Sequence, residues 1–586
     1  MSSILDAESL LAIDVGSVNT RAALFDVVDG HYRLVATGRV PSTAGAPLFD
    51  ISEGVRMALD QIQKITGKRL IDENESLIMP VKSDAVGVDT FVATTTTGPN
   101  VRTVLVGLMP GVSMESVRRL AAMSYLDVVE EISLMDRRRD EEQIDVILSA
   151  RPDVIMVAGG TDGGAQDSIL RMMETVGLAA SLLPPQQQPR IIYAGNRRLV
   201  EEIIARFGRR LTIIPTANIR PNLEQEELGP ARKRLTEAIA EVRSARIVGF
   251  DYLEQWSGGH FLLTADAFGR VIRYLSLIYS PEKGVLGVDL GASQVTIAAA
   301  FDGKLNVSIQ ADIGMGTSLT GLLERSSLEE IKRWLPIEVL DSQIRDYIFN
   351  KALYPATIPA EIEELHLEFA LARQVLRSAL SKARRGWESD GRVYSSVLMP
   401  QLEPIIASGA VFANAPKPEF TALMLLDAVQ PTGISTFVLD PHSVTSALGV
   451  TAGPVPILTV QVLESGGYIS LGTVVAPIGR SRMGRRVLRV QLEREGRAED
   501  VVGEVRMGQL VVIPLAQGEQ GRLTLRPERG IDVGFGSPGR AGTLRVTGGT
   551  VGLIIDARGR PLELPKDAGH RRELNQKWLW DIGAME

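Results

Sequence analysis

The sequence of 586 residues contains no cysteine, and this absence removes several kinds of chemistry at once. Disulfides, thiolate zinc sites, iron–sulfur clusters and cysteine nucleophiles all depend on that side chain. Histidine is scarce as well, with five residues in the whole chain, and no two of them lie within one helical turn in sequence. The sequence therefore offers little basis for thiol chemistry or for a histidine metal site.

The chain also lacks an excess of positive charge and any long hydrophobic run. Its 63 Lys and Arg against 71 Asp and Glu give a net charge of -8, so nothing draws the whole protein toward nucleic acid or anionic lipid. No uncharged apolar run approaches about 18 residues, which excludes a membrane-spanning helix. The first residues carry Asp6 and Glu8 without Lys or Arg, unlike a signal peptide. We expect a cytoplasmic protein.

Apolar runs and helical periods alternate along most of the chain. Ile51 to Thr66 has apolar residues at helical spacing, whereas Val154 to Ala158 is a short, fully apolar run typical of a central strand. This alternation predicts an α/β protein. From Pro454 onward, beginning with Val455 to Leu463, short β-branched runs are separated by Gly, Pro and charged residues, which predicts an antiparallel β-barrel or sandwich. We predict the divisions 1–283, 284–453 with a helical insertion over 317–395, and 454–586.

The strongest feature is an internal repeat, in which LAIDVGS at 11–17 matches LGVDLGA at 286–292. Each copy has an apolar strand, an Asp-x-Gly turn and a second apolar strand. Glycine lets the backbone approach a phosphate and turn its N–H groups toward it. An Asp at the end of the strand can accept hydrogen bonds from water on a bound Mg²⁺. The repeat therefore predicts two hairpins that clamp a nucleotide with Mg²⁺, and Asp14 and Asp289 are the expected metal-binding and catalytic carboxylates.

The residues expected to contact the nucleotide extend over both copies of the repeat. In the first loop these are Gly16, Ser17, Asn19 and Thr20, and in the second they are Gly291 and Ala292.

Another glycine-rich loop, Gly159 to Gly164, follows the apolar strand and precedes a helix that begins near Gln166. That placement suits an anion at a helix N-terminus, with Gly159, Gly160 and Thr161 as contacts. The alternative is a tight turn that lets the helix pack closely. Both interpretations remain open on the sequence.

Two polar motifs have equally open roles. Asp312 precedes Gly314 and Gly316, so it could accept a proton from an attacking water, or it could be a turn residue. The four threonines at 94–97 could contact phosphate or form a strand edge.

The paired hairpins resemble the phosphate loops of the actin, hexokinase and Hsp70 superfamily. That resemblance implies a duplicated actin-like ATPase fold with two RNase H-like halves, and ATP as the nucleotide. It also implies that a strand ending in a small turn holds the adenosine, here at Ser408 and Gly409.

The chain further resembles the glutamate mutase accessory ATPases known as MutL or GlmL, over about residues 9–453. The resemblance implies a slow ATPase that acts as a reactivating or maturation chaperone of an adenosylcobalamin-dependent mutase. Ala292 and Val295 stand where the first loop has Ser17 and Thr20, so the second loop offers fewer hydroxyls to phosphate. Ser408 stands where the superfamily commonly has glycine. Both departures make rapid hydrolysis less expected. The matching motifs are at 13–17, 93–98, 158–164, 287–291 and 311–316.

Two other functions remain open on the sequence. One is a small-molecule kinase of the same fold, for which Asp312 and Asp89 are the candidate bases. The other is an actin-like assembly or filament protein, which would use the β-rich tail for contacts and form homo-oligomers. Trp578 and Trp580 near the end of the chain could dock the terminus onto the body or form a subunit contact.

Overall fold

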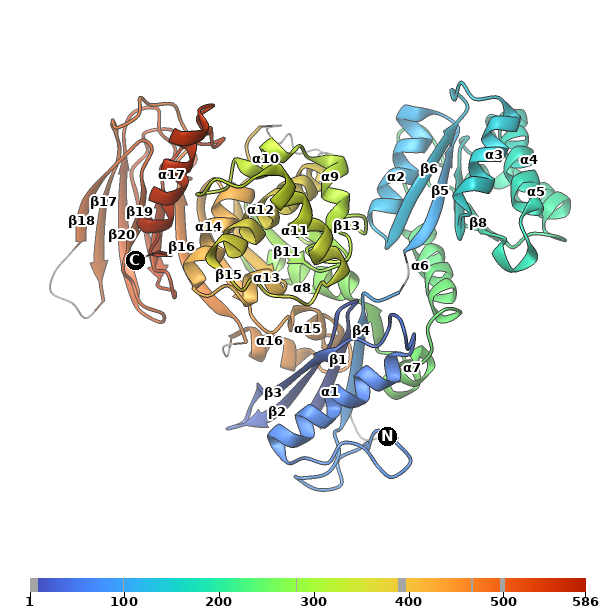
Figure 1. Cartoon of the computed structure of the whole chain (residues 1–586), viewed down its shortest axis with the longest axis horizontal. Coiled ribbons are helices and arrows are strands. Elements are labelled where there is room, and N and C mark those ends of the chain that lie inside the picture. Colours follow the sequence, from blue (N-terminus) through green and yellow to red (C-terminus); the bar gives the residue numbers. More distant parts are fainter. Residues whose placement is uncertain are drawn as a thin grey trace.

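The first repeat begins a five-stranded mixed sheet in the computed structural model (Figure 1). Strands β1 (Ser9–Val15), β2 (Asn19–Val28) and β3 (His31–Pro41) form an antiparallel meander. β4 (Thr90–Thr95) then pairs parallel to β1, and β10 (Phe261–Leu263) pairs parallel to β4, so the order is β10-β4-β1-β2-β3. The structure describes residues 9–98, 100–280, 282–387, 397–464, 467–495 and 501–585.

The second repeat begins a sheet with the same arrangement. Its strands run in the order β13-β12-β11-β14-β15, and β14 and β15 are parallel to β11, just as β4 and β10 are parallel to β1. The predicted α/β class and the duplicated actin-like fold are therefore confirmed. The five strands are β11 (Gly284–Leu290), β12 (Val295–Phe301), β13 (Lys304–Gln310), β14 (Leu402–Ser408) and β15 (Gly433–Asp440).

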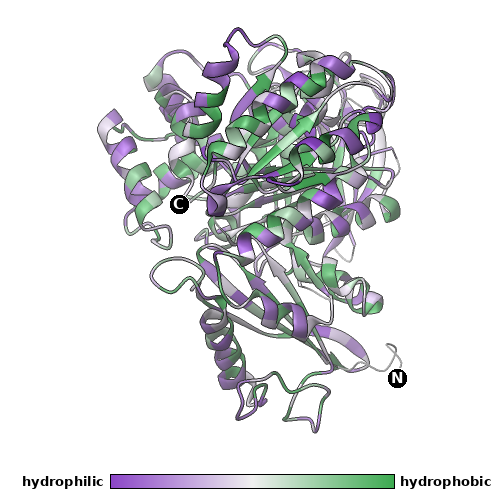
Figure 2. Cartoon of the chain, turned by 90° about the vertical axis from the view of Figure 1, so that its right-hand side faces the viewer, coloured by the Kyte–Doolittle hydropathy of each residue, from purple (hydrophilic) through white to green (hydrophobic). Residues whose placement is uncertain are grey.

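The helices complete the correspondence between the halves. α1 (Ile51–Thr66) connects β3 to β4, and α12 (Ile362–Arg384) connects β13 to β14. α8 (Thr264–Ile278) and α15 (Thr445–Thr451) contribute to a hydrophobic core shared by both halves. Figure 2 shows hydrophobic residues concentrated on the inner strands, with hydrophilic residues common on the outer helices.

The predicted helical insertion over 317–395 contains three α-helices ahead of α12, while residues 388–395 lie outside the described part of the chain. These helices are α9 (Leu322–Arg325), α10 (Leu328–Lys332) and α11 (Asp341–Leu353).

A separate α/β lobe is inserted between β4 and β10, within the region that the sequence analysis assigned to the first half. Its five strands are all parallel, in the order β6-β5-β7-β8-β9, with one hydrophobic cluster on each face of the sheet. In Figure 1 this lobe lies to one side of the two halves, and it contacts them through α2 (Glu115–Ala122), which lies against β13, and through Tyr125, whose hydroxyl accepts the Ala265 N–H at 2.7 Å. The strands are β5 (Val101–Gly107), β6 (Leu126–Ser133), β7 (Val154–Ala158), β8 (Arg190–Tyr193) and β9 (Ile213–Pro215). Further helices are α3 (Asp140–Ala150), α4 (Gln166–Leu182), α5 (Val200–Phe207) and α6 (Gly229–Ser244).

The β-rich tail continues the sheet of the second half. β16 (Ile469–Ala476) pairs antiparallel to β15, and β22 (Leu553–Asp556) and β19 (Leu510–Ile513) extend the row. A second antiparallel sheet has the order β18-β17-β20-β21 and shares a core with this extension. The predicted antiparallel sheet is confirmed, although these described strands pair as an open row and do not establish a barrel. The second sheet comprises β17 (Arg486–Arg494), β18 (Val501–Arg506), β20 (Gln520–Pro527) and β21 (Gly542–Thr547).

The predicted boundary at 453/454 falls just before α16 (Pro456–Glu464). The strand predicted over Val455 to Leu463 was wrong, because Leu458 and Val462 repeat at helical spacing and are both buried. Within the described ranges, no helix is both long enough and apolar enough to span a membrane.

The last helix, α17 (Ala568–Asp581), docks onto the helical region of the second half. The Asn575 side chain donates to the backbone oxygens of Arg333 and Leu335 at 3.0 and 3.2 Å. Trp578 is buried, and the guanidinium of Arg558 lies 4.6 Å from its ring centroid, whereas Trp580 remains exposed. Trp578 thus packs the end of the chain onto the body, one of the two roles proposed for the paired tryptophans.

Candidate functional site

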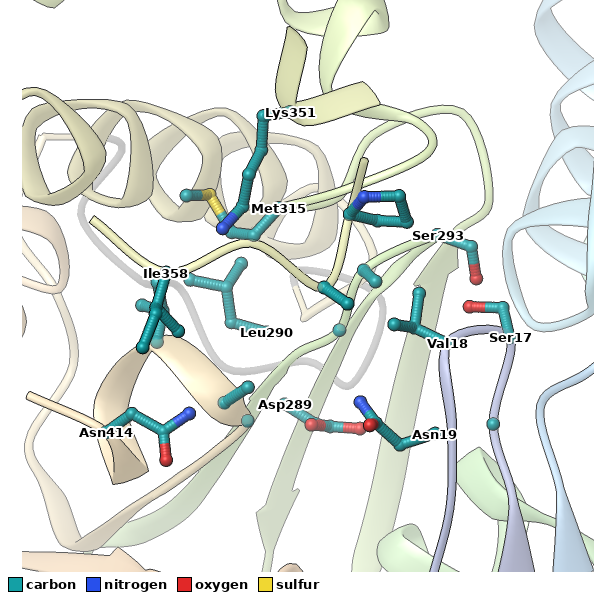
Figure 3. Close-up of a pocket in the computed structure, with 18 of the residues that line it drawn as sticks. Ser17, Val18, Asn19, Asp289, Leu290, Ser293, Met315, Lys351, Ile358 and Asn414 are labelled. Atoms are coloured by element: carbon teal, nitrogen blue, oxygen red, sulfur yellow. The ribbon is translucent and has the colours of Figure 1, made fainter. Parts of the chain in front are cut away.

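The two Asp-x-Gly turns have the same local geometry and line one cavity of about 650 Å³ (Figure 3). The Gly16 N–H donates to the Asn19 carbonyl at 3.0 Å, and the Gly291 N–H donates to the Gln294 carbonyl at 3.0 Å. A Cβ added at Gly16 would lie 2.8 Å from the Asn19 oxygen, so this tight turn requires glycine. The repeated sequence motif therefore forms two turns of the same geometry, and both turns line the cavity.

The first carboxylate, Asp14, is held at the end of β1 by hydroxyl groups. Thr94 and Thr264 donate to Asp14 Oδ1 at 2.8 and 2.9 Å, and Arg21 on β2 lies 3.7 Å from Oδ2. One threonine of the run at 94–97, Thr94, therefore donates a hydrogen bond to Asp14, and another, Thr96, lines the cavity. These contacts orient Asp14 toward the space between the loops.

The second carboxylate, Asp289, has a different environment at the end of β11. Burial raises the pKa of Asp289 to about 6; Arg21 opposes this shift, while the negative charges of Asp14 and Asp440 add to it. In Figure 3 the side chains of Asp289 and Asn19 point toward one another across the cleft. The clustered negative charge favours either a proton on Asp289 or a cation nearby.

Asp440 completes this group, although the sequence analysis did not single it out. It ends β15, is fully buried, and accepts N–H groups from Val444 and Thr445 at 2.9 Å each. A usable signal was present, since VLD at 438–440 ends an apolar strand in Asp as AID and GVD do in the repeat.

The loop at 312–316 supports the second turn through backbone hydrogen bonds. The Met315 N–H donates to the Gly291 carbonyl and the Gly316 N–H to the Ala292 carbonyl, both at 2.8 Å. A Cβ on Gly314 would lie 2.6 Å from the Ala292 oxygen, so only glycine fits there. Met315 reaches the cavity, but Gly314 and Gly316 do not line it. Their place in the structure is behind the predicted nucleotide contacts.

Asp312 lies outside the cavity lining, and its carboxylate pairs with Arg325. The predicted role as general base therefore lacks the necessary geometry, because an ion-paired carboxylate away from the cavity does not reach the space between the loops.

The predicted adenosine turn does border the cavity. Gly409 has φ +116°, and a Cβ there would lie 2.4 Å from the Leu290 oxygen. Asn414, which follows α13 (Ala410–Ala413), points its side chain into the cavity in Figure 3. Ser408 is buried behind the turn, with Oγ 3.5 Å from Asp440 Oδ2, so the backbone of Gly409 is what faces the space.

Two other predicted contacts lie elsewhere. Thr20 is fully buried, with its hydroxyl packed beside Gly54 of α1, and it does not line the cavity. Gly159, Gly160 and Thr161 belong to the inserted lobe, where Asn218 donates to the Gly160 carbonyl at 3.0 Å. The structure therefore does not bring this loop to the paired turns, since the chain leaves the first half after β4.

Residues 355–359 form another part of the cavity wall, and the sequence did not predict them as site residues. Lys351 is buried; it donates to the Thr357 carbonyl and lies 3.1 Å from Glu368 on α12. In Figure 3 Ile358 lies on the side of the cavity away from Ser17 and Ser293. A buried ion pair thus fixes the segment that closes one side of the cavity.

The second loop is not without hydroxyls, because Ser293 takes the place next to Ala292. In Figure 3 the hydroxyl groups of Ser17 and Ser293 point toward one another from the two loops. Across the described residues, no group of three or more His, Asp or Glu side chains is arranged to hold a metal directly. Asp14 and Asp289 therefore remain candidates for contacts to a metal through water.

Comparison with known proteins gives one family. The family model described as MutL protein matches residues 10–466. A relative, "Protein MutL" from Clostridium tetanomorphum, is 22% identical over 491 residues, which cover 78% of this chain and 98% of that protein.

Solved structures show more distant likenesses. A nucleotide-free acetone carboxylase is 12% identical, with a TM-score of 0.31, covering 85% of this chain and 81% of that chain. A nucleotide-free diol dehydratase-reactivating factor is 11% identical, with a TM-score of 0.30, covering 78% of this chain and 100% of that chain. Xylulose kinase from Bifidobacterium adolescentis is 11% identical, with a TM-score of 0.28, covering 79% and 94%. Likeness at this distance does not assign a function.

Proposed function

The chain belongs to the MutL protein family, and on that basis we propose that it is a slow ATPase that reactivates or matures an adenosylcobalamin-dependent mutase. ATP would bind in the cavity between the two halves. A mutase of the glutamate mutase type is the proposed client, as the family resemblance implies.

The observation that carries the nucleotide part of the proposal is the pair of matching turns on opposite sides of one cavity. Backbone N–H groups at such glycine turns suit phosphate oxygens, and their fixed positions cost little reorganisation when an anion binds. The hydroxyls of Ser17 and Ser293 add donors from both sides. Two halves joined through such a cleft can also close on a ligand, which is what nucleotide-controlled binding of a client requires.

The carboxylates suit a divalent cation. Three aspartates, Asp14, Asp289 and Asp440, influence one another, and Arg21 is the cation that offsets them. Asp14 and Asp289 would hold Mg²⁺ through its water shell, and the ion would neutralise phosphate charge when bound. Asp440 is engaged by the backbone of residues 444–445 and is less available.

Slow hydrolysis follows from the same arrangement. Asp14 Oδ1 already accepts two threonine hydroxyls, and Glu368 is paired with Lys351. Among the described residues that line the cavity, this leaves Asp289, with its pKa near 6, as the carboxylate able to take a proton from water. A base that must also face a metal is a poor one, which favours long occupancy over fast turnover.

Binding measurements with the full-length protein test the proposal. We expect Asp14→Ala and Asp289→Ala each to weaken Mg·ATP binding at least about tenfold, since each removes a charged contact of roughly 1.5–3 kcal/mol. Asp145→Ala, at an exposed position on α3 of the inserted lobe, is the matched control and should bind as wild type does. Unchanged ATP binding in both cleft variants would remove the basis of the nucleotide assignment.

The client is tested separately, by adding the purified protein with ATP to an inactivated cobalamin mutase and measuring recovered activity. Recovery that requires ATP and fails with Asp14→Ala is the expected result. Phosphorylation of a metabolite would instead favour the kinase, and polymers that sediment with ATP would favour the assembly protein.

A further inference from the structure

A second cavity of about 350 Å³ adjoins the first along β1, β2 and β3. The two cavities share five lining residues: Asp14, Arg21, Arg39, Ala410 and Asn414. The rest of its lining comes from β1, β2 and β3, from Ala413, and from the segment after β15 that includes His442 and Ser443 and leads into α15. Arg21 and Arg39 therefore stand at the junction of two spaces.

These two arginines form a like-charged pair. Arg21 on β2 and Arg39 on β3 are directly opposite partners in the antiparallel ladder. Like charges in that position destabilise a sheet unless something offsets them. Arg21 has partial compensation from Asp14 at 3.7 Å. For the Arg39 guanidinium, no carboxylate partner is found among the residues that the structure describes.

Arg39 is an exposed residue, and its guanidinium is only partly desolvated. This partial burial lowers the pKa of Arg39, and the neighbouring charge of Arg21 lowers it further. The Arg39 backbone N–H is anchored by the Gln61 side chain at 2.5 Å, which fixes the strand at this point.

The second half lacks the pair, which separates it from the needs of the fold. Thr296 is opposite Asp289, as Arg21 is opposite Asp14, and Ile309 is opposite Thr296, as Arg39 is opposite Arg21. The same ladder thus forms with Thr and Ile in these places. Two arginines occur in one half alone, where they face the shared cavity space.

We propose that Arg21 and Arg39 together bind one phosphate group at the junction of the two cavities. The group is either the terminal phosphate of a bound nucleoside triphosphate or free inorganic phosphate beside a diphosphate. Two guanidinium groups offer donors in the fork geometry that matches phosphate oxygens. An anion there would relieve the repulsion between them. The negative charge of Asp14 is partly offset by the two threonine hydroxyls on its Oδ1 and by Arg21, which lies 3.7 Å from its Oδ2.

The inference rests on the proposed nucleotide site and adds a specific consequence: the arginine pair distinguishes a triphosphate from a diphosphate. Because ADP has no third phosphate, loss of Arg39 should affect ATP and spare ADP. Arg39 would act as a sensor of the nucleotide state, which a client-binding ATPase needs.

Calorimetric titration of the full-length protein with Mg²⁺ and either a non-hydrolysable ATP analogue or ADP is the test. For Arg39→Ala and Arg39→Gln we expect the dissociation constant of the analogue to rise about tenfold or more, as loss of a charged hydrogen bond would give. The constant for ADP should stay within about twofold. Arg33→Ala, an exposed position on the same strand outside both cavities, should change neither constant.

A second titration separates the two sources of the phosphate. Inorganic phosphate is added to the wild-type protein saturated with ADP, and then to Arg39→Gln. Binding that disappears in the variant identifies free phosphate as an occupant; no binding to either protein identifies the terminal phosphate of the triphosphate.

The outcomes distinguish a failure of the arginine-pair proposal from a failure of the proposed nucleotide site. If Arg39→Gln weakens the analogue and ADP equally, or changes neither, the arginine pair is not the receptor although the nucleotide site stands. If the wild type binds neither nucleotide, the proposed function itself fails. A circular dichroism spectrum identical to that of wild type confirms that each variant is folded before its titration is interpreted.

Discussion

Three aspartates at strand ends show how position in the cleft decides what one residue type can do. Asp14 accepts two hydroxyls, Asp289 has its pKa raised to about 6, and Asp440 is fully buried and accepts N–H groups from the loop that follows it. The sequence shows the same short pattern for all three, an apolar strand ending in Asp. The different partners come from segments up to 250 residues away, such as Thr264 for Asp14.

His366 gives a prediction at the residue scale, through the pH dependence of stability. The pKa of His366 on α12 is lowered to about 4, mainly by burial and also by the charge of Arg373, while Glu363 opposes the shift. The unfolded chain titrates near 6.5, so it binds a proton before the native protein does as the pH falls. The stability that neutral His366 contributes is present above pH 6.5 and is lost between about pH 6.5 and 4, amounting to about 2 kcal/mol by pH 5.

We expect the difference in unfolding free energy between pH 7 and pH 5 to be smaller in His366→Gln than in wild type by about that amount. Urea unfolding followed by circular dichroism at both pH values measures it. His570→Gln, at an exposed position on α17, should keep the wild-type difference. Equal pH dependence in wild type and His366→Gln would contradict the assignment.

At the scale of elements, the two turns are alike but their supports are not. The first turn is supported by the residue that follows β4, since the Thr96 N–H donates to the Val15 carbonyl at 3.0 Å. The second turn is braced by the loop at 312–316, in which two N–H groups reach its carbonyls. The glycines of that loop therefore allow one backbone to pack closely on another, and a motif predicted to contact a ligand is placed where it supports the second turn.

Gly314→Ala tests that positioning role. The added Cβ would meet the Ala292 carbonyl and must displace the second turn, which should cost about 1–3 kcal/mol of stability. Because the turn itself moves, ATP affinity should fall too. Gly503→Ala on β18, where a Cβ meets nothing within 4 Å, should change stability by no more than about 0.5 kcal/mol. Thermal unfolding and ATP titration of both variants give the comparison, and an unchanged Gly314→Ala would show that the loop yields freely.

For the whole molecule, local patterns predicted more than long-range arrangement. The repeat identified both halves because Asp, Gly and the flanking strands lie within a few residues of one another. The inserted lobe was assigned to the first half, since nothing in the strand at 154–158 or the glycine loop after it indicates which sheet they join. Arg21 and Arg39 escaped notice for a similar reason: only the register between β2 and β3 makes them partners.

The tail illustrates the same limit. The amino-acid composition changes near residue 454, and the sequence therefore predicted a boundary there. The strands of the tail nevertheless extend the sheet of the second half, because β16 pairs with β15. A buried charge network strengthens that connection. Asp427 on α14 (Pro418–Ala428) pairs with Arg373 on α12 and with Arg558 beyond β22, each at 2.8 Å, and Arg558 also pairs with Asp556 at 2.9 Å. All four side chains are buried, and they come from the two regions that the predicted boundary separates.

We therefore expect the second half and the tail to unfold together. Asp427→Ala leaves Arg373 and Arg558 without one buried partner each, which should cost about 3–5 kcal/mol and lower the melting temperature of a single shared transition. Arg545→Ala breaks an exposed ion pair with Glu495 in the same tail and should cost less than about 1 kcal/mol. Calorimetry, read alongside limited proteolysis of the tail, distinguishes the cases. If the tail melted in a separate transition that Asp427→Ala left unchanged, the network would not couple the two regions, and the boundary at 453/454 would mark an independent domain after all.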